Sequence, residues 1–228
     1  MLSELGVPEQ APEVLAIREH LRLWRFYDHF RTDATAPARA SQPGTRTPIL
    51  SPDGADLAAA LQTIIENGAS ERLAEVIDRA FPGSRLEIVY PGSHGEDRDP
   101  ASRFEVARHQ PGLLRPLGTV ELSDGTLRYL LLVAALLSPR PPALFVLNEP
   151  ETSLHPDLFA PLATLIQVAA KNAQIIVVTH AETLVEGLSP EDSVEVSAQI
   201  VELEKEDGET KIRGQRGLDE PSWTRPAR

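Results

Sequence analysis

Two short apolar runs, separated by a segment with helical spacing, constrain the fold of this chain more than any other feature. The runs are residues 143–147 and 174–179, and the second is rich in β-branched side chains. Between them, residues 157–170 repeat apolar positions at helical intervals. A strand, a crossover helix and a second strand of these lengths form a βαβ unit with parallel strands. The sequence therefore predicts an α/β fold built on a parallel sheet.

The chemistry of a site follows directly after each of these runs. Asn148 and Glu149 come after the first run, and His180 comes after the second. Open α/β folds bind their ligands at the carboxyl ends of the strands. Since two parallel strands end at one edge of a sheet, we expect the Glu149 carboxylate and the His180 imidazole to converge there.

A small polar turn over residues 121–126 opens a helix that we predict over residues 123–137. The turn places Ser123 and Gly125 at the helix N-terminus, where free backbone N–H groups and a partial positive charge suit an anion such as phosphate.

Upstream, residues 1–121 predict a helical region with a small β lobe. Residues 14–30 have helical spacing and an aromatic face, and residues 31–54 indicate an extended connection that contacts could order. Two more helices and an antiparallel pair of strands are expected over residues 56–67, 70–81, 85–90 and 103–108.

The aromatic residues of the first helix allow two interpretations. They could form a platform on which bases stack, or they could belong to the core. The leucines at positions 21 and 23 lie among them, which favours the core. The residues concerned are Trp24, Phe26, Tyr27 and Phe30.

The C-terminal part predicts a hairpin and a tail. The pattern predicts two strands, residues 193–203 and 209–212, joined across Asp207 and Gly208. We expect disorder after Gly214. The predicted parts are thus residues 1–121, an α/β core over 122–192, the hairpin over 193–213 and a tail over 214–228.

Composition narrows the classes of function. The chain has 22 Lys and Arg against 34 Asp and Glu, a net charge of −12, which argues against holding nucleic acid or anionic lipid by bulk electrostatics. It has no cysteine, which excludes thiolate chemistry and fits a reducing compartment. The longest apolar run, residues 130–137, is shorter than the roughly 20 residues that span a bilayer, and the N-terminus does not resemble a signal peptide. We expect a cytoplasmic protein with no membrane partner.

Four motifs, in this order along the chain, resemble the C-terminal half of the ABC-type ATPase superfamily. Within it, the RecF/SMC-like and OLD-like AAA family ATPases of the AAA_21 type are the most similar. LSDGT (122–126) resembles the signature motif, LFVLNEPE (144–151) the Walker B motif, SLHP (153–156) the D-loop and VVTH (177–180) the switch-histidine strand. The resemblance implies part of an ABC-type P-loop NTPase fold with a parallel sheet core, a helical lid region and a small antiparallel β lobe.

The resemblance also implies roles for individual residues, with ATP and Mg²⁺ as cofactors. Glu149 would polarise the attacking water, and His180 would contact the γ-phosphate. Asn148 and Glu149 would lie at the metal. The signature residues would reach nucleotide held by another subunit, and the D-loop would lie at the same dimer interface. These are Ser123, Asp124, Gly125 and Thr126 for the signature motif, and Ser153, Leu154, His155 and Pro156 for the D-loop.

The sequence departs from the family pattern at two points. Asn148 stands where an acidic residue usually precedes the catalytic glutamate, so a charge that would help hold Mg²⁺ is missing. No GxxxxGK[ST] occurs anywhere in the chain, so the phosphate cradle is absent. The chain is therefore interpreted as a C-terminal portion of such an ATPase.

Three functions remain open at this point. The first is an ATPase module that hydrolyses ATP at a dimer interface, in DNA repair or in defence against foreign DNA. The second is a non-catalytic subunit that docks onto an intact ATPase, and the third is a degenerate fragment. Binding of nucleic acid rests on analogy with the family alone.

Overall fold

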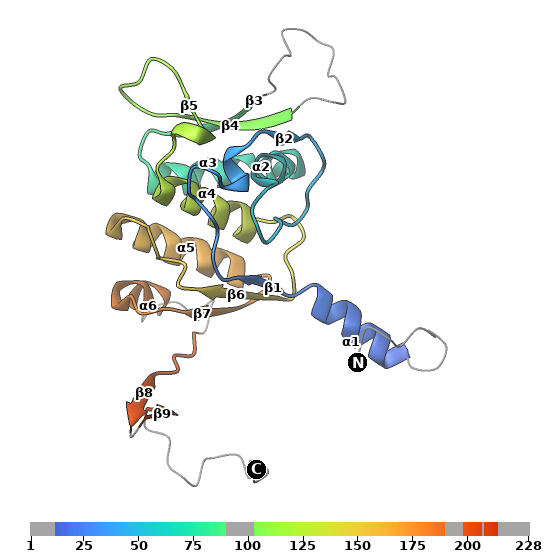
Figure 1. The fold of residues 1–228 in the computed structure, drawn as a ribbon, viewed down its shortest axis with the longest axis vertical. Helices are drawn as coiled ribbons and strands as arrows, with labels where there is room; N and C mark the ends of the chain where they lie inside the picture. Colours follow the sequence, from blue (N-terminus) through green and yellow to red (C-terminus); the bar gives the residue numbers. More distant parts are fainter. Residues whose placement is uncertain (1–11, 90–102, 190–197, 207, 214–228) are drawn as a thin grey trace. The chain divides into compact units, whose positions relative to one another are not determined.

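The computed structural model describes residues 12–89, 103–189, 198–206 and 208–213. The chain divides into two compact units, Met1–Val196 and Ser197–Arg228. The first unit is mixed α/β, with a parallel sheet, several helices and a small antiparallel sheet (Figure 1). The predicted fold class is therefore confirmed.

The parallel sheet has three strands in the order β1-β6-β7, which are β1 (Arg25–Tyr27), β6 (Leu144–Asn148) and β7 (Gln174–Val178). A 3₁₀ turn, η4 (Pro156–Leu158), and helix α5 (Phe159–Ala170) connect β6 to β7. The short helix α6 (Glu182–Leu188) follows β7. The predicted βαβ unit is thus confirmed, with its strands parallel.

The helix expected over residues 14–30 is wrong in its second half. Helix α1 (Pro12–Arg22) ends early, and β1 then pairs in parallel with β6. The buried hydroxyl of Tyr27 donates a hydrogen bond to the carbonyl oxygen of Leu50 at 2.9 Å. Pairing with a buried strand and packing of Tyr27 outweigh the helical spacing, because tertiary contacts override local propensity.

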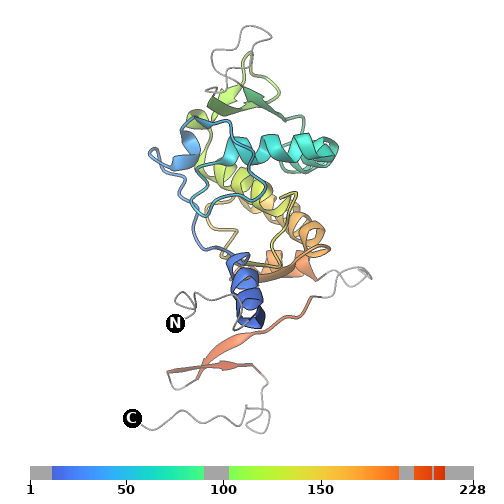
Figure 2. The same cartoon turned by 90° about the vertical axis from the view of Figure 1, so that its right-hand side faces the viewer.

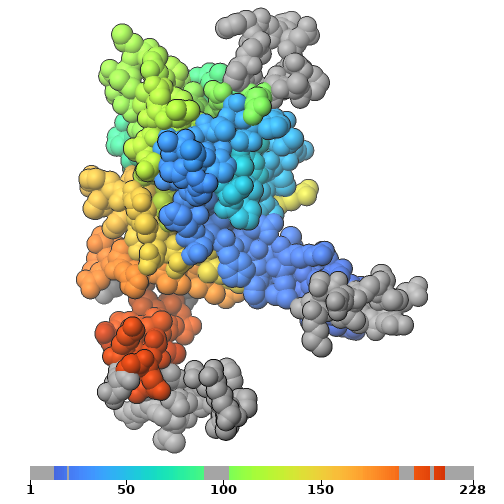
Figure 3. Space-filling view, in the orientation of Figure 1, coloured from blue at the N-terminus to red at the C-terminus, as the bar shows by residue number. Residues whose placement is uncertain are grey.

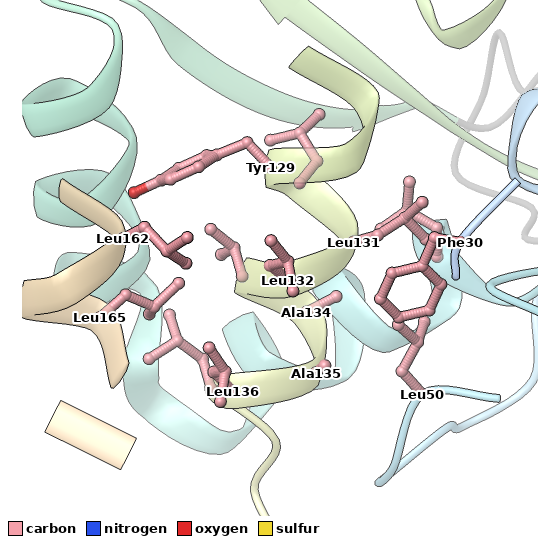
Figure 4. Close-up of a cluster of buried hydrophobic side chains, with 14 of the residues drawn as sticks. Phe30, Leu50, Tyr129, Leu131, Leu132, Ala134, Ala135, Leu136, Leu162 and Leu165 are labelled. Atoms are coloured by element: carbon pink, nitrogen blue, oxygen red, sulfur yellow. The ribbon is translucent and has the colours of Figure 1, made fainter. Parts of the chain in front are cut away.

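Helix α4 (Asp124–Leu136) is the centre of the core, and all its residues from Thr126 onward are buried. Figure 4 shows Tyr129, Leu132 and Leu136 on the side towards Leu162 and Leu165 of α5, while Leu131 lies beside Phe30 and Leu50. Of the aromatic residues weighed for base stacking, Tyr27 and Phe30 are core residues. Phe26 is 57% exposed.

The helical layer continues with α2 (Leu57–Ile64) and α3 (Ser70–Ala80), which a π turn over Ile65–Ala69 joins. Gly68 has a φ of 84° inside this turn, where a side chain would be strained. The segment between β1 and α2 lies across the front of the helices (Figure 3), and Leu50 in it is buried. The expected ordered connection is confirmed.

The small antiparallel sheet consists of β3 (Arg85–Val89) and β4 (Arg103–His109), as predicted, and of two shorter strands. These are β2 (Gln42–Pro43) and β5 (Leu117–Gly118), which both pair with β4. They are too short for any periodicity to show in the sequence. Two 3₁₀ turns, η1 (Pro37–Arg39) and η3 (Thr119–Glu121), complete the described elements of this unit.

In the second unit, β8 (Leu203–Glu206) and β9 (Glu209–Ile212) form an antiparallel hairpin, and Gly208 turns between them with a φ of 83°. The first strand begins at Leu203, so the prediction of a strand over residues 198–202 is wrong. The reason is that β9 offers partners to only four residues. The start of the predicted strand, residues 193–197, and the expected disordered tail, 214–228, lie outside the described residues.

Candidate active site

The carboxyl ends of β6 and β7 meet as the sequence predicts. Asn148 pairs with Val178, and the backbone N–H of Glu149 donates to the carbonyl oxygen of Val178 at 2.7 Å. Nε2 of His180 lies 3.4 Å from Oε1 of Glu149, and the two side chains are 85% and 46% exposed. The convergence of a carboxylate and an imidazole at this edge is confirmed, within reach of solvent and of a ligand.

Glu149 has an unusual backbone conformation. Its φ is 43°, in the left-handed region that residues other than glycine rarely adopt. Thr152 closes a turn on it: the backbone N–H of Thr152 donates to the Glu149 carbonyl oxygen at 3.0 Å, and its hydroxyl to Oε2 at 3.4 Å. Strained residues persist only where their surroundings hold them, and they concentrate at functional sites. The turn therefore fixes the position of the carboxylate.

A second carboxylate, Glu151, ties the ends of the two strands together. Its Oε1 accepts hydrogen bonds from the hydroxyl of Thr179 at 2.5 Å and from the backbone N–H of His180 at 3.2 Å. Glu151 thus fixes the backbone that carries the imidazole. The sequence places Glu151 in the NEPE motif, but no pattern in it predicts these hydrogen bonds to the residues that follow β7.

Asn148 faces an acidic residue that lay outside the predicted site. Asp28 follows directly after β1, and Nδ2 of Asn148 donates to Oδ1 of Asp28 at 2.6 Å. The prediction of one helix over residues 14–30 concealed this residue, because Asp28 would then be an ordinary exposed side chain. Recognition of Arg25–Tyr27 as a third parallel strand would have placed Asp28 at the same edge as Glu149.

The oxygen atoms at this edge suit Mg²⁺ chemically. Asp28, Asn148 and Glu149 provide carboxylate and amide oxygens, and Mg²⁺ is usually held by one or two carboxylates together with substrate phosphates. Among the residues that the structure describes, no group of three or more His, Cys, Asp or Glu side chains could hold a metal ion.

The predicted phosphate-binding turn caps helix α4. Oγ of Ser123 accepts a hydrogen bond from the backbone N–H of Thr126 at 3.2 Å, and the Ser123 hydroxyl donates to Oγ1 of Thr126 at 2.9 Å. This arrangement is a side-chain N-cap, which stabilises the start of the helix. The predicted start of this helix is confirmed.

A buried arginine holds the turn before α4. Arg39 is 8% exposed and donates to the carbonyl oxygens of Thr119 and Leu122 at 2.7 and 2.9 Å. It also pairs with the Asp124 carboxylate at 2.7 Å. The Asp124 side chain, predicted to help bind phosphate, is bound to Arg39 in this structure.

Gly125 lies against the loop over residues 153–156. A Cβ at this position would lie 2.6 Å from the carbonyl oxygen of Ser153, and Ser153 itself has a φ of 66°. In the same loop, Leu154 is buried whereas the His155 side chain is 72% exposed. Pro156 begins η4. The structure thus brings the LSDGT and SLHP motifs into contact with each other within one chain.

A family model described as "AAA domain, putative AbiEii toxin, Type IV TA system", named AAA_21, matches residues 8–186. That range includes every residue of the site described above. No curated protein matches this chain. Within the part of the chain that the structure describes, no helix is long and apolar enough to cross a membrane.

Solved structures show the same fold. The Smc head domain with a coiled coil and joint from Pyrococcus yayanosii matches with a TM-score of 0.51 and 15% identity, over 67% of this chain and 27% of that one. The SmcHead bound to the C-winged helix domain of ScpA matches with a TM-score of 0.51 and 17% identity, over 67% and 43%. A Pyrococcus furiosus Smc head domain bound to the C-terminal domain of ScpA matches with a TM-score of 0.51 and 17% identity, over 67% of this chain and 35% of that one.

This chain therefore spans less than half the length of these relatives, and the likeness concerns the fold. The family match over residues 8–186 shows to which family the chain belongs. The chain belongs to the AAA_21 family of AAA domains, and over about two thirds of its length it has the fold of Smc head domains.

Proposed function

We propose that this chain supplies the carboxylate and imidazole half of a site that hydrolyses ATP at an interface between subunits. The observation that carries the proposal is the pair of Glu149 and His180, 3.4 Å apart at the carboxyl edge of a parallel sheet, with Glu149 held at a φ of 43°. Phosphoryl transfer needs a positioned water and stabilised charge rather than a nucleophilic side chain. A carboxylate can position the water, and an imidazole beside it can stabilise the charge on the phosphate.

Each group has a separate task in this proposal. Glu149 orients the attacking water and accepts its proton, while His180 contacts the γ-phosphate of bound ATP. Asn148 and Glu149 would hold Mg²⁺, which would neutralise charge on the phosphates when bound. Ser123 and Gly125, at the N-terminus of α4, face the nucleotide of another subunit, where backbone N–H groups favour an anion.

The phosphate cradle must come from another polypeptide segment, because the sequence contains no GxxxxGK[ST]. The sheet has a surface that such a segment would cover. Helices α4 and α5 lie on one side of the parallel sheet (Figure 2). Phe26, Val146 and Ile176 form a row across the three strands. Because side chains alternate along a strand, this row lies on the face opposite to the buried Phe145 and Leu147 of β6. Phe26 and Ile176 are 57% and 45% exposed, whereas parallel sheets are normally covered on both faces. We propose that the segment with the P-loop covers this face and pairs with β7, an edge strand among the described residues.

The cellular setting is part of the same proposal. We place the chain in a cytoplasmic ATPase of DNA repair or defence, in agreement with the absence of cysteine and with a family description that includes a putative toxin of a toxin–antitoxin system. Contact with nucleic acid rests on analogy with the family.

A second candidate is a non-catalytic subunit that docks onto an intact ATPase. The missing P-loop favours it, and so does the engagement of the Asp124 carboxylate by Arg39. Coexpression with the P-loop segment of another AAA_21 protein separates the two. Mg²⁺-dependent ATP hydrolysis by the complex supports the enzyme, and a stable complex without hydrolysis supports the docking subunit. Failure to form a complex contradicts both.

A further inference from the structure

Helix α4 carries a buried positive charge that none of the motifs above explains. Arg128 is only 3% exposed, and its apolar neighbours Leu127 and Tyr129 are fully buried. Burial lowers the pKa of the Arg128 guanidinium, while the nearby carboxylates of Glu151 and Glu149 act in the opposite direction. A charge in the core is costly unless its hydrogen-bond partners are well placed. The partners of Arg128 therefore indicate what it does.

The guanidinium of Arg128 reaches the turn that holds the site carboxylate. Its Nη2 donates to the carbonyl oxygen of Glu149 at 3.1 Å, and its Nη1 lies 3.3 Å from Nδ1 of His29. The same carbonyl oxygen accepts the backbone N–H of Thr152 at 3.0 Å. Arg128 thus completes the hydrogen bonding of the one carbonyl around which the left-handed Glu149 turn is built.

We infer that Arg128 is a positioning residue that couples helix α4, and with it the LSDGT motif, to the Glu149 carboxylate. The inference rests on the proposed function for its catalytic consequence, but its structural part stands on the contacts alone. A shift of α4 moves the guanidinium, and with it the Glu149 carbonyl, since no other described side chain joins α4 to this oxygen. Nucleotide contact at Ser123 and Gly125 would thereby change the position of the carboxylate in the same subunit.

Hydrogen exchange of the full chain tests the structural part without any nucleotide. In Arg128→Met, exchange of the Glu149 and Thr152 amides should accelerate about tenfold more than exchange of the Leu147 amide in β6. Arg128→Lys should show a smaller change in the same direction, because one ammonium group cannot replace the several donors of the planar guanidinium. This variant provides the test if Arg128→Met does not fold.

Leu130→Ala is the matched control, since Leu130 is fully buried in the same helix and has no part in the turn. It should accelerate exchange at all three amides alike. The same uniform pattern in the Arg128 variants, or no acceleration at the Glu149 and Thr152 amides, would overturn the inference.

The catalytic part is tested in the complex with a P-loop segment. Arg128→Lys should lower kcat by about tenfold or more and leave KM for ATP within about twofold, because it displaces the carboxylate and not the nucleotide. An unchanged kcat contradicts the coupling. If the unaltered complex does not hydrolyse ATP, the proposed function fails, while the exchange experiment still decides whether Arg128 holds the turn.

Discussion

The side-chain amide of Asn148 donates a hydrogen bond of 2.6 Å to the carboxylate of Asp28, so the polar end of β6 is fixed by the residue that follows β1. The position that lacks its usual carboxylate thus has a carboxylate as its immediate neighbour. An amide and a carboxylate are complementary there, whereas two carboxylates would repel each other unless a cation lay between them.

Asn148→Asp should therefore destabilise the protein at neutral pH when Mg²⁺ is absent. Two carboxylates at this separation should cost about 1 to 2 kcal/mol of the free energy of unfolding near the surface. Millimolar Mg²⁺ should restore much of this loss by binding between them. Thermal unfolding with and without Mg²⁺ measures both effects. The exchanged variant Asp28→Asn with Asn148→Asp is the control, because it keeps one carboxylate and one amide; equal sensitivity of both variants to Mg²⁺ would contradict this account.

Gly125 gives a test of the contact between the two motifs. Gly125→Ala places a Cβ 2.6 Å from the carbonyl oxygen of Ser153, and this oxygen can move away only if the backbone of the loop shifts. The variant should lose about 1 to 3 kcal/mol of the free energy of unfolding in urea. Gly118→Ala is the matched control, since nothing lies within 4 Å of its Cβ position, and it should change stability by less than about 0.5 kcal/mol. A neutral Gly125→Ala would mean that the loop is free to move away.

The Arg115 guanidinium forms two hydrogen bonds to Glu121, just before the LSDGT motif, at 2.7 and 2.8 Å. These bonds, with one from the backbone N–H of Gly118, lower the pKa of Glu121 from 4.5 to about 2. The pair therefore stabilises the fold above pH 4.5, and this contribution is lost as the pH falls through about 2. Arg115→Gln should raise the pKa of Glu121 towards its ordinary value. A carboxyl ¹³C titration measures it, and an unchanged midpoint would contradict the assignment.

ATP binding by the chain alone should be weak or undetectable. The β- and γ-phosphates need a glycine-rich loop and its lysine, and the sequence contains neither. Isothermal titration calorimetry with ATP and Mg²⁺ measures this directly. Micromolar affinity would show that residues of this chain form a phosphate cradle of another kind.

The elements that sequence predicted well are those with strong local patterns. The apolar runs predicted β6 and β7, and their parallel pairing predicted that Glu149 and His180 converge at one edge of the sheet. The structure places the two side chains 3.4 Å apart. Ser123 marked the start of α4 because capping is a local interaction. Periodicity is sufficient where a segment is long and uniformly apolar on one face.

The features that sequence missed depend on contacts between distant segments. Strand β1 has three residues, and only pairing with β6 makes it a strand, so Asp28 was not recognised at the site. Arg39 belongs to the predicted extended connection and Arg128 to the helix predicted over residues 123–137, and no local pattern marks either as buried. Both are buried because carbonyl oxygens of distant turns accept their hydrogen bonds. The left-handed conformation of Glu149 likewise follows from its surroundings and not from its residue type.

The most direct test of the central proposal is the Glu149→Gln variant in the complex with a P-loop segment. The amide keeps the shape of the side chain but cannot accept a proton, so Mg²⁺-dependent ATP hydrolysis should fall by about 10²-fold or more while ATP binding persists. Glu182→Gln is the control, since it alters an acidic residue of α6 away from the described contacts of Glu149, and it should leave turnover unchanged. Equal turnover in the Glu149→Gln and unaltered complexes would contradict the role of the carboxylate and leave the chain as a docking subunit.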